Sequence, residues 1–60
     1  MNKMIAELKM KDGRDISVFS VRNVRYNGSL LELIQLNGHT FAYPLCAIAD
    51  ISIEVVNDKD

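Results

Sequence analysis

Three Xaa-Gly pairs divide this chain into segments: Asp12-Gly13, Asn27-Gly28 and Asn37-Gly38. Each pair lies between stretches in which apolar and polar residues alternate. Asn-Gly and Asp-Gly accept positive φ at the centre of a tight turn, as two-residue hairpin loops require. The pattern therefore predicts an all-β chain of antiparallel strands joined by short hairpins.

The first two predicted strands differ in their regularity. Residues 4–11 alternate cleanly, whereas residues 16–26 change phase near Phe19–Asn23. A straight strand cannot keep all of its apolar side chains on one side through such a change, so we expect a bulge or a sharp bend there. A three-residue loop around Asp12-Gly13 would bring the apolar side chains of both strands to the same side.

The second half of the chain predicts three more strands and one short turn. Residues 29–36 and 39–43 read as the third and fourth strands, and residues 51–56 as the fifth. Pro44 lacks an N–H and should end a ladder, and the residues after it suit a single 3₁₀ turn.

This order of elements resembles the SH3-like barrel, in which a 3₁₀ turn joins the last two strands. The segment Tyr43-Pro44-Leu45-Cys46-Ala47-Ile48 occupies the corresponding place. The resemblance implies a five-stranded antiparallel SH3-like small barrel over residues 1–56. The polar residues 57–60 read as a disordered tail. It is a resemblance of architecture, so no binding residue of the SH3 or Sm-like proteins is carried over to this chain.

The hairpin turns also predict which side chains share a face. Two-residue turns at Asn27-Gly28 and Asn37-Gly38 would place Val24 opposite Leu31, and Ile34 opposite Phe41. One face would then be small, aliphatic and dry, with Tyr26 near its rim: Val24, Leu31, Leu33 and Ala42. The other face would carry the candidate binding residues, a mixture of charged, aliphatic and aromatic side chains that favours an interface: Arg25, Glu32, Ile34, His39, Phe41 and Tyr43. In the reversed arrangement, Ile34, Phe41 and Tyr43 would form the core.

The composition limits the chemistry that this chain can perform. The 60 residues include one cysteine, Cys46, and one histidine, His39, which excludes an internal disulfide and falls short of a structural zinc site. No nucleophile or phosphate-loop motif is present, so we expect no catalytic residue, no metal, no cofactor and no enzymatic activity. An apolar content of 48% in so small a domain favours a homo-oligomer.

Charge and hydropathy limit the partners and the compartment. The net charge of −1 argues against general nucleic-acid affinity, although residues 1–29 carry six Lys or Arg against three acids and residues 30–60 carry one against five. Without a signal peptide or an apolar segment of membrane-spanning length, the chain is expected to be cytoplasmic, in the host cytoplasm if a phage encodes it, and to bind no membrane.

Three functions fit these features. The first is a non-enzymatic protein that binds a host protein stoichiometrically, in the style of a small phage or mobile-element regulator or inhibitor, including one directed against host defence. The second is an Sm-like or sponge-like oligomer that binds RNA or a small nucleotide. The third is a structural subunit of a larger assembly.

Overall fold

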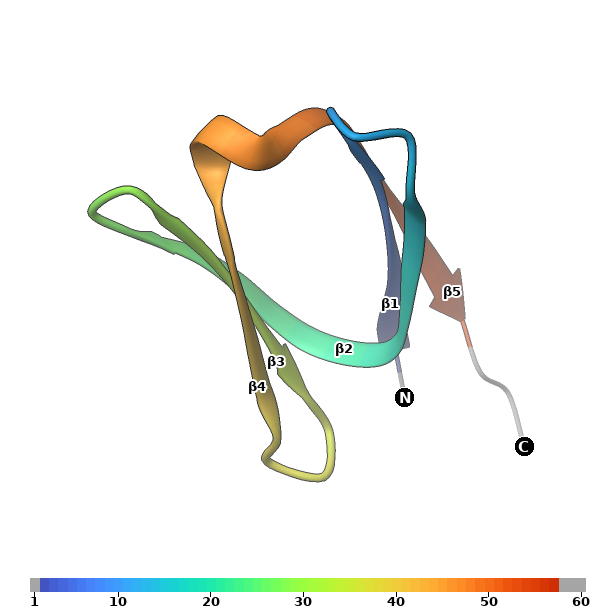
Figure 1. Cartoon of the computed structure of the whole chain (residues 1–60). Coiled ribbons are helices and arrows are strands. Elements are labelled where there is room, and N and C mark those ends of the chain that lie inside the picture. The colour runs from blue at the N-terminus through green and yellow to red at the C-terminus, as the bar shows by residue number, and fades with distance from the viewer. Residues whose placement is uncertain (1, 58–60) are drawn as a thin grey trace.

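The computed structural model describes residues 2–57 of the chain, with the side chains of residues 3–56. It contains five strands, β1 (Asn2–Met10), β2 (Asp15–Asn27), β3 (Leu30–Gln35), β4 (Thr40–Pro44) and β5 (Ile48–Asn57), with the 3₁₀ turn η1 (Leu45–Ala47) before the last of them (Figure 1). The predicted all-β class and the 3₁₀ turn are confirmed. The last strand is longer than expected, because it begins at Ile48 and reaches Asn57. Asn57 was expected in the tail and is instead part of β5, and residues 58–60 of the predicted tail lie outside the described residues.

All five strands belong to one antiparallel sheet in the order β4-β3-β2-β1-β5. The sheet is open, with β4 and β5 as its two edge strands, so the closed ladder of a barrel is not formed. β2 is the long central strand, and Figure 1 shows it sweeping from the side of β1 to the side of β3. Its first half pairs with β1 and its second half with β3.

The bend in β2 lies where the phase of the sequence changes. The register with β1 shifts between Met4 and Ala6, and the register with β3 shifts between Val21 and Asn23. Ser20 adopts a left-handed conformation with φ of 57°, and its carbonyl accepts a hydrogen bond of 2.8 Å from the Leu36 N–H. The predicted bulge near Phe19–Asn23 is therefore confirmed, and it lets one strand serve two differently oriented halves of the sheet.

The three-residue loop predicted between β1 and β2 is also confirmed. The Met10 N–H donates to the Arg14 carbonyl and the Gly13 N–H to the Met10 carbonyl, at 2.8 and 3.0 Å. Gly13 has φ of +96°, as the last residue of such a loop requires. This loop places Ile16 opposite Leu8, so the apolar side chains of both strands share a side.

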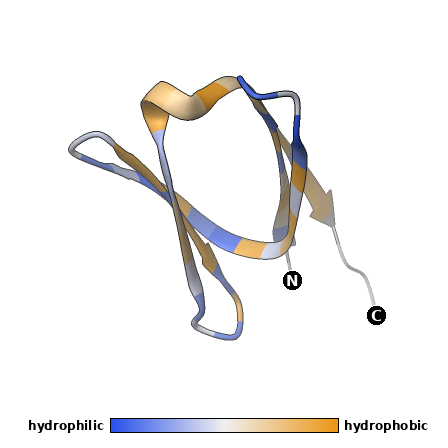
Figure 2. Ribbon diagram, viewed as in Figure 1, coloured by the Kyte–Doolittle hydropathy of each residue, from blue (hydrophilic) through white to orange (hydrophobic). Residues whose placement is uncertain are grey.

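The core lies on one side of the sheet, which we call the core face. Apolar residues alternate with polar ones along β1 and the first part of β2. Figure 2 shows orange and blue segments along the whole of β2. The buried cluster comprises Ala6, Leu8, Met10, Val18, Val21, Leu31 and Leu33. Leu45, Ala47 and Ile48 pack against this cluster, so η1 and the start of β5 help to cover it. The side opposite the core face is called the outer face below.

Candidate functional site

The outer face of β2, β3 and β4 is a flat array of nine side chains, three from each strand. The register aligns them in three cross-strand rows: Asn27, Leu30 and Pro44; Arg25, Glu32 and Ala42; Asn23, Ile34 and Thr40. Seven of the nine residues are exposed, whereas Glu32 is half-buried and Ile34 is buried. Glu32 therefore occupies the centre of the array, and we call these nine residues the outer-face array.

An ion pair forms the middle of this array. The Arg25 Nε donates to the Glu32 Oε1 at 2.5 Å, and the Asn27 Nδ2 donates to the Glu32 Oε2 at 3.3 Å. Both carboxylate oxygens of Glu32 thus accept a hydrogen bond from β2. The bond from Arg25, and then the bond from Asn27, hold the pKa of Glu32 below its ordinary value, because both favour the ionised form.

The same contact orients the Arg25 guanidinium. The Arg25 side chain is 59% exposed, whereas that of Glu32 is 13% exposed. Among the described residues, only the Nε of Arg25 donates a hydrogen bond, which leaves its two terminal amino groups available to an acceptor on another molecule. A guanidinium held in this way is ready to bind a carboxylate with two parallel hydrogen bonds.

The face predicted for two of the candidate residues is wrong. Phe41 lies opposite Leu33, and Tyr43 lies opposite Leu31, so both belong to the core face rather than to the side of Arg25 and Glu32. The cause is the turn. The Gln35 N–H donates to the His39 carbonyl at 2.8 Å, which makes a three-residue loop instead of a two-residue loop.

Gly38 has the conformation that this three-residue loop requires. Its φ is +92°, and its N–H donates to the Gln35 carbonyl at 3.0 Å, the arrangement of a turn followed by a left-handed residue. The extra residue shifts the register of β4 by one, which moves each of its side chains to the opposite face. Ala42, expected on the dry face, is accordingly exposed on the outer face.

The register between β2 and β3 also differs from the prediction, but the side chains of both strands lie on the predicted faces of the sheet. Asn27 pairs with Leu30, so the central turn residues are Gly28 and Ser29. Gly28 has φ of +62°, and Ser29 is not among the residues with positive φ, which is the pattern of a type II′ turn. The pairs are displaced by two residues from those expected. Because the side-chain period is two, Val24, Leu31 and Leu33 still share the core face.

The six predicted site residues are therefore divided between two places. Arg25, Glu32 and Ile34 belong to the outer-face array, although Ile34 is only 8% exposed and offers little surface. The alternative prediction placed Ile34, Phe41 and Tyr43 together on the core face. It is correct for the faces of Phe41 and Tyr43 and wrong for the face of Ile34. His39 is exposed beside the last turn, where its N–H donates to the Asn37 Oδ1 at 2.9 Å.

Six members of the array were not among the predicted site residues: Asn23, Asn27, Leu30, Thr40, Ala42 and Pro44. Asn27 reads as a turn residue, and nothing in its neighbours signals the bond to Glu32. Ala42 was placed on the wrong face by the one-residue shift. Pro44 reads only as the end of a ladder.

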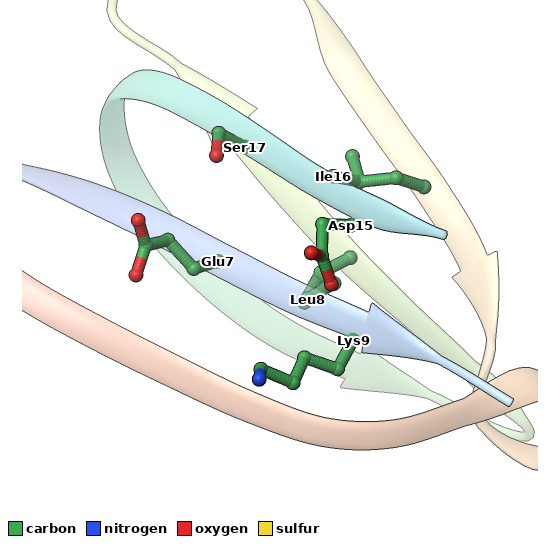
Figure 3. A pocket seen from close by; sticks show the side chains of 6 residues that line it. All are labelled: Glu7, Leu8, Lys9, Asp15, Ile16 and Ser17. Atoms are coloured by element: carbon green, nitrogen blue, oxygen red, sulfur yellow. The ribbon is translucent and has the colours of Figure 1, made fainter. Parts of the chain in front are cut away.

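A shallow pocket of about 290 Å³ lies on the other half of the sheet, between β1 and β2. Figure 3 shows the side chains that line it, with Glu7 and Lys9 on β1 and Asp15 and Ser17 on β2. Lys9 lies opposite Asp15 on one side and Asp50 on the other, so opposite charges alternate across three strands. These side chains are exposed, and such an arrangement is typical of a solvated sheet surface.

Over residues 2–57, no three His, Cys, Asp or Glu side chains are grouped so that they could hold a metal ion. The same part of the chain contains no helix with the length and apolar character needed to cross a membrane. Comparison with known proteins finds no matching family model, and neither the curated proteins nor the solved structures give a significant match.

Proposed function

We propose that this chain is a non-enzymatic binding protein with an SH3-like fold, which binds a partner protein stoichiometrically through the outer-face array. The array lies on the outer face of β2, β3 and β4, and its Arg25 is held in orientation by the hydrogen bond to Glu32 at the centre. This pre-oriented arginine is the observation that carries the proposal, since arginine and flanking apolar surface are enriched in protein interfaces.

The SH3-like assignment rests on three features together. The sheet order, the bend that lets β2 serve both halves of the sheet, and the 3₁₀ turn between β4 and β5 are all typical of that architecture. In this proposal the open side between the two edge strands is spanned by η1 rather than by a ladder.

The chemistry of the array favours a protein over a nucleic acid as the partner. Arg25 is its only basic residue, and Glu32 already neutralises it. Leu30, Ala42 and Pro44 supply exposed apolar surface beside the ion pair. Nucleic-acid affinity depends on several phosphate contacts from Lys or Arg, which this face does not provide. A partner with an acidic side chain amid apolar ones fits the array better, as expected of a phage or mobile-element inhibitor of a host protein.

The test is an affinity purification with surface variants. Immobilised wild-type chain should retain one protein in a stoichiometric amount from a lysate of the natural host, whereas Arg25→Glu and Ala42→Arg should lose it. Ser17→Arg, which adds the same charge to the outer face of the other half of the sheet, is the control and should retain it. Circular dichroism would establish that all four chains are folded.

Two results would overturn this function. One is equal retention of the protein by wild type and by both array variants. The other is calorimetric binding of RNA or a nucleotide to the wild-type chain at low salt, where phosphate contacts are strongest, with no protein retained.

A further inference from the structure

β5 is the longer of the two edge strands of the sheet. It has ten residues, pairs only with β1, and contains neither proline nor lysine. The opposite edge strand, β4, has five residues and ends at Pro44, which has no N–H. Short strands and edge prolines are devices that prevent pairing with another chain, so β4 is protected and β5 is open to pairing.

Two hydrogen bonds show which backbone groups of β5 face outward. The Met10 N–H points to β2, because it donates to Arg14, and the Lys11 N–H points to the other side, because it donates to the Ala47 carbonyl. Backbone groups alternate in direction along a strand, so the odd-numbered residues of β1 bond to β5. Their partners in β5 are the even-numbered residues from Asp50 to Val56.

The outward groups of β5 therefore belong to Ile51, Ile53 and Val55. An independent contact agrees, since the Ile51 N–H donates to the Asp50 Oδ1 at 2.9 Å rather than to β1. The side chains of these three residues lie on the core face, opposite Leu8, Ala6 and Met4. Ile53 is 41% exposed and Val55 is 63% exposed, so apolar surface accompanies the free backbone groups.

We propose that a second copy of this chain pairs with this edge, antiparallel, about a two-fold axis centred on Ile53. In that register Ile53 lies opposite Ile53 of the second copy, and Ile51 lies opposite its Val55. The three residues whose backbone groups point away from β1 then lie opposite the same three residues of the second copy. At least four backbone hydrogen bonds form between the copies, and the bond between Asp50 and Ile51 is kept. The apolar side chains also meet in cross-strand pairs.

Charge selects this register over its neighbours. A centre at Ser52 would place Asp50 opposite Glu54 of the second copy, twice over. A centre at Glu54 would place two Glu54 side chains opposite each other. Two carboxylates directly opposite each other would destabilise the pairing of the strands. With the centre at Ile53, Glu54 faces Ser52 and Asp50 faces Val56, so no such pair forms.

This association goes beyond the proposed function, because it uses the edge of β5 at the far end of the sheet from the outer-face array. It would join two five-stranded sheets into one. Partner binding by the array and pairing at β5 can each fail without the other.

The test measures molar mass by sedimentation equilibrium over about 1–500 μM, a range suited to dissociation constants in the micromolar region. The wild type should reach twice the monomer mass. Ile53→Pro removes an outward N–H and no bond to β1, and should stay monomeric. Thr40→Pro, the control, alters the first residue of the other edge strand and should still dimerise. Val55→Lys should weaken dimerisation roughly tenfold or more, through loss of an apolar cross-strand pair and desolvation of a charge.

A second measurement tests the register itself. Ser52→Lys would place an ammonium opposite Glu54 of the second copy in the proposed register, and should tighten the dimer roughly fivefold at low salt. With a centre at Ser52, the same substitution would oppose two ammonium groups and weaken it. Wild-type monomer at all concentrations, a larger ring, dimerisation of Ile53→Pro, or weakening by Ser52→Lys would each overturn the proposal.

Discussion

Leu33 lies directly opposite Phe41 across the β3–β4 pair, yet Leu33 is fully buried and Phe41 is 39% exposed. The pair marks the limit of the core on this side of the sheet. β3 is an interior strand with neighbours on both sides, whereas β4 is an edge strand whose side chains have a neighbour on only one side. Substitutions on the two strands should therefore have very different costs.

Leu33→Ala should lower the free energy of unfolding by about 2–5 kcal/mol, because it removes buried methyl groups and leaves a cavity. Stabilities of domains this small are about 3–5 kcal/mol, so this variant should be largely unfolded. Leu36→Ala makes the same chemical change at a residue that is 42% exposed, and should cost less than about 1 kcal/mol. Urea unfolding followed by circular dichroism, at one fixed protein concentration, would compare them. Equal losses would mean that Leu33 is not a core residue.

Ser20 is the only non-glycine residue with positive φ among those described, so its backbone conformation should control stability. Ser20→Val should destabilise the chain by about 2 kcal/mol, since a β-branched residue is strongly disfavoured in the left-handed region. Ser20→Asn should be close to neutral, because asparagine tolerates that region. Thermal and urea unfolding of the two variants would measure the difference. A Ser20→Val chain as stable as wild type would mean that the bend does not require positive φ.

The Arg25–Glu32 contact should appear in the pH dependence of stability. The folded pKa of Glu32 is lowered, chiefly by its hydrogen bond from Arg25. The unfolded chain therefore takes up a proton at a higher pH than the folded chain does. The stabilisation is fully present above the ordinary pKa of 4.5 and is lost as the pH falls through the folded value.

Carboxyl chemical shifts recorded between pH 2 and 7 by nuclear magnetic resonance would measure that pKa. We expect a midpoint below 4.5 for Glu32 in the wild type, a clear rise in Arg25→Gln, and a smaller rise in Asn27→Ala. The Asp12 carboxyl provides an internal control, because its pKa is lowered by Arg14 in a different hairpin and should not move in either variant. The same Glu32 midpoint in wild type and Arg25→Gln would show that the ion pair does not form in solution.

The alternation and the turn residues were sufficient to predict the strands, the bulge and the 3₁₀ turn. What they could not predict was the position of the second loop and the length of the third. Asn27-Gly28 and Asn37-Gly38 look alike in sequence, yet Asn27 ends β2 before a two-residue loop of Gly28 and Ser29, whereas both Asn37 and Gly38 belong to a three-residue loop. Both loops place glycine at positive φ, so local propensity hardly distinguishes them.

The sequence predicted the correct face for only some of the candidate site residues. Arg25 and Glu32 were placed on one face because a two-residue displacement preserves the faces of a strand. Phe41 was misplaced because a one-residue shift reverses them. The loop length decides which side chains of β4 face the core, and the three-residue loop lets Tyr43 pack against the buried cluster. That packing is a tertiary property that the turn sequence does not contain.

The pairing of β1 with β5 has a consequence for the order in which the sheet assembles. β1, β2, β3 and β4 each pair with a sequence neighbour, but β5 closes onto the opposite end of the chain, with Asn2 opposite Asn57. Because β1, β2, β3 and β4 pair in chain order, their ladders can form before β5 is added, and β1 is then a bare edge. β5 therefore covers an edge of β1 within the molecule, and a chain truncated before Ile48 would expose that edge to pairing with other chains.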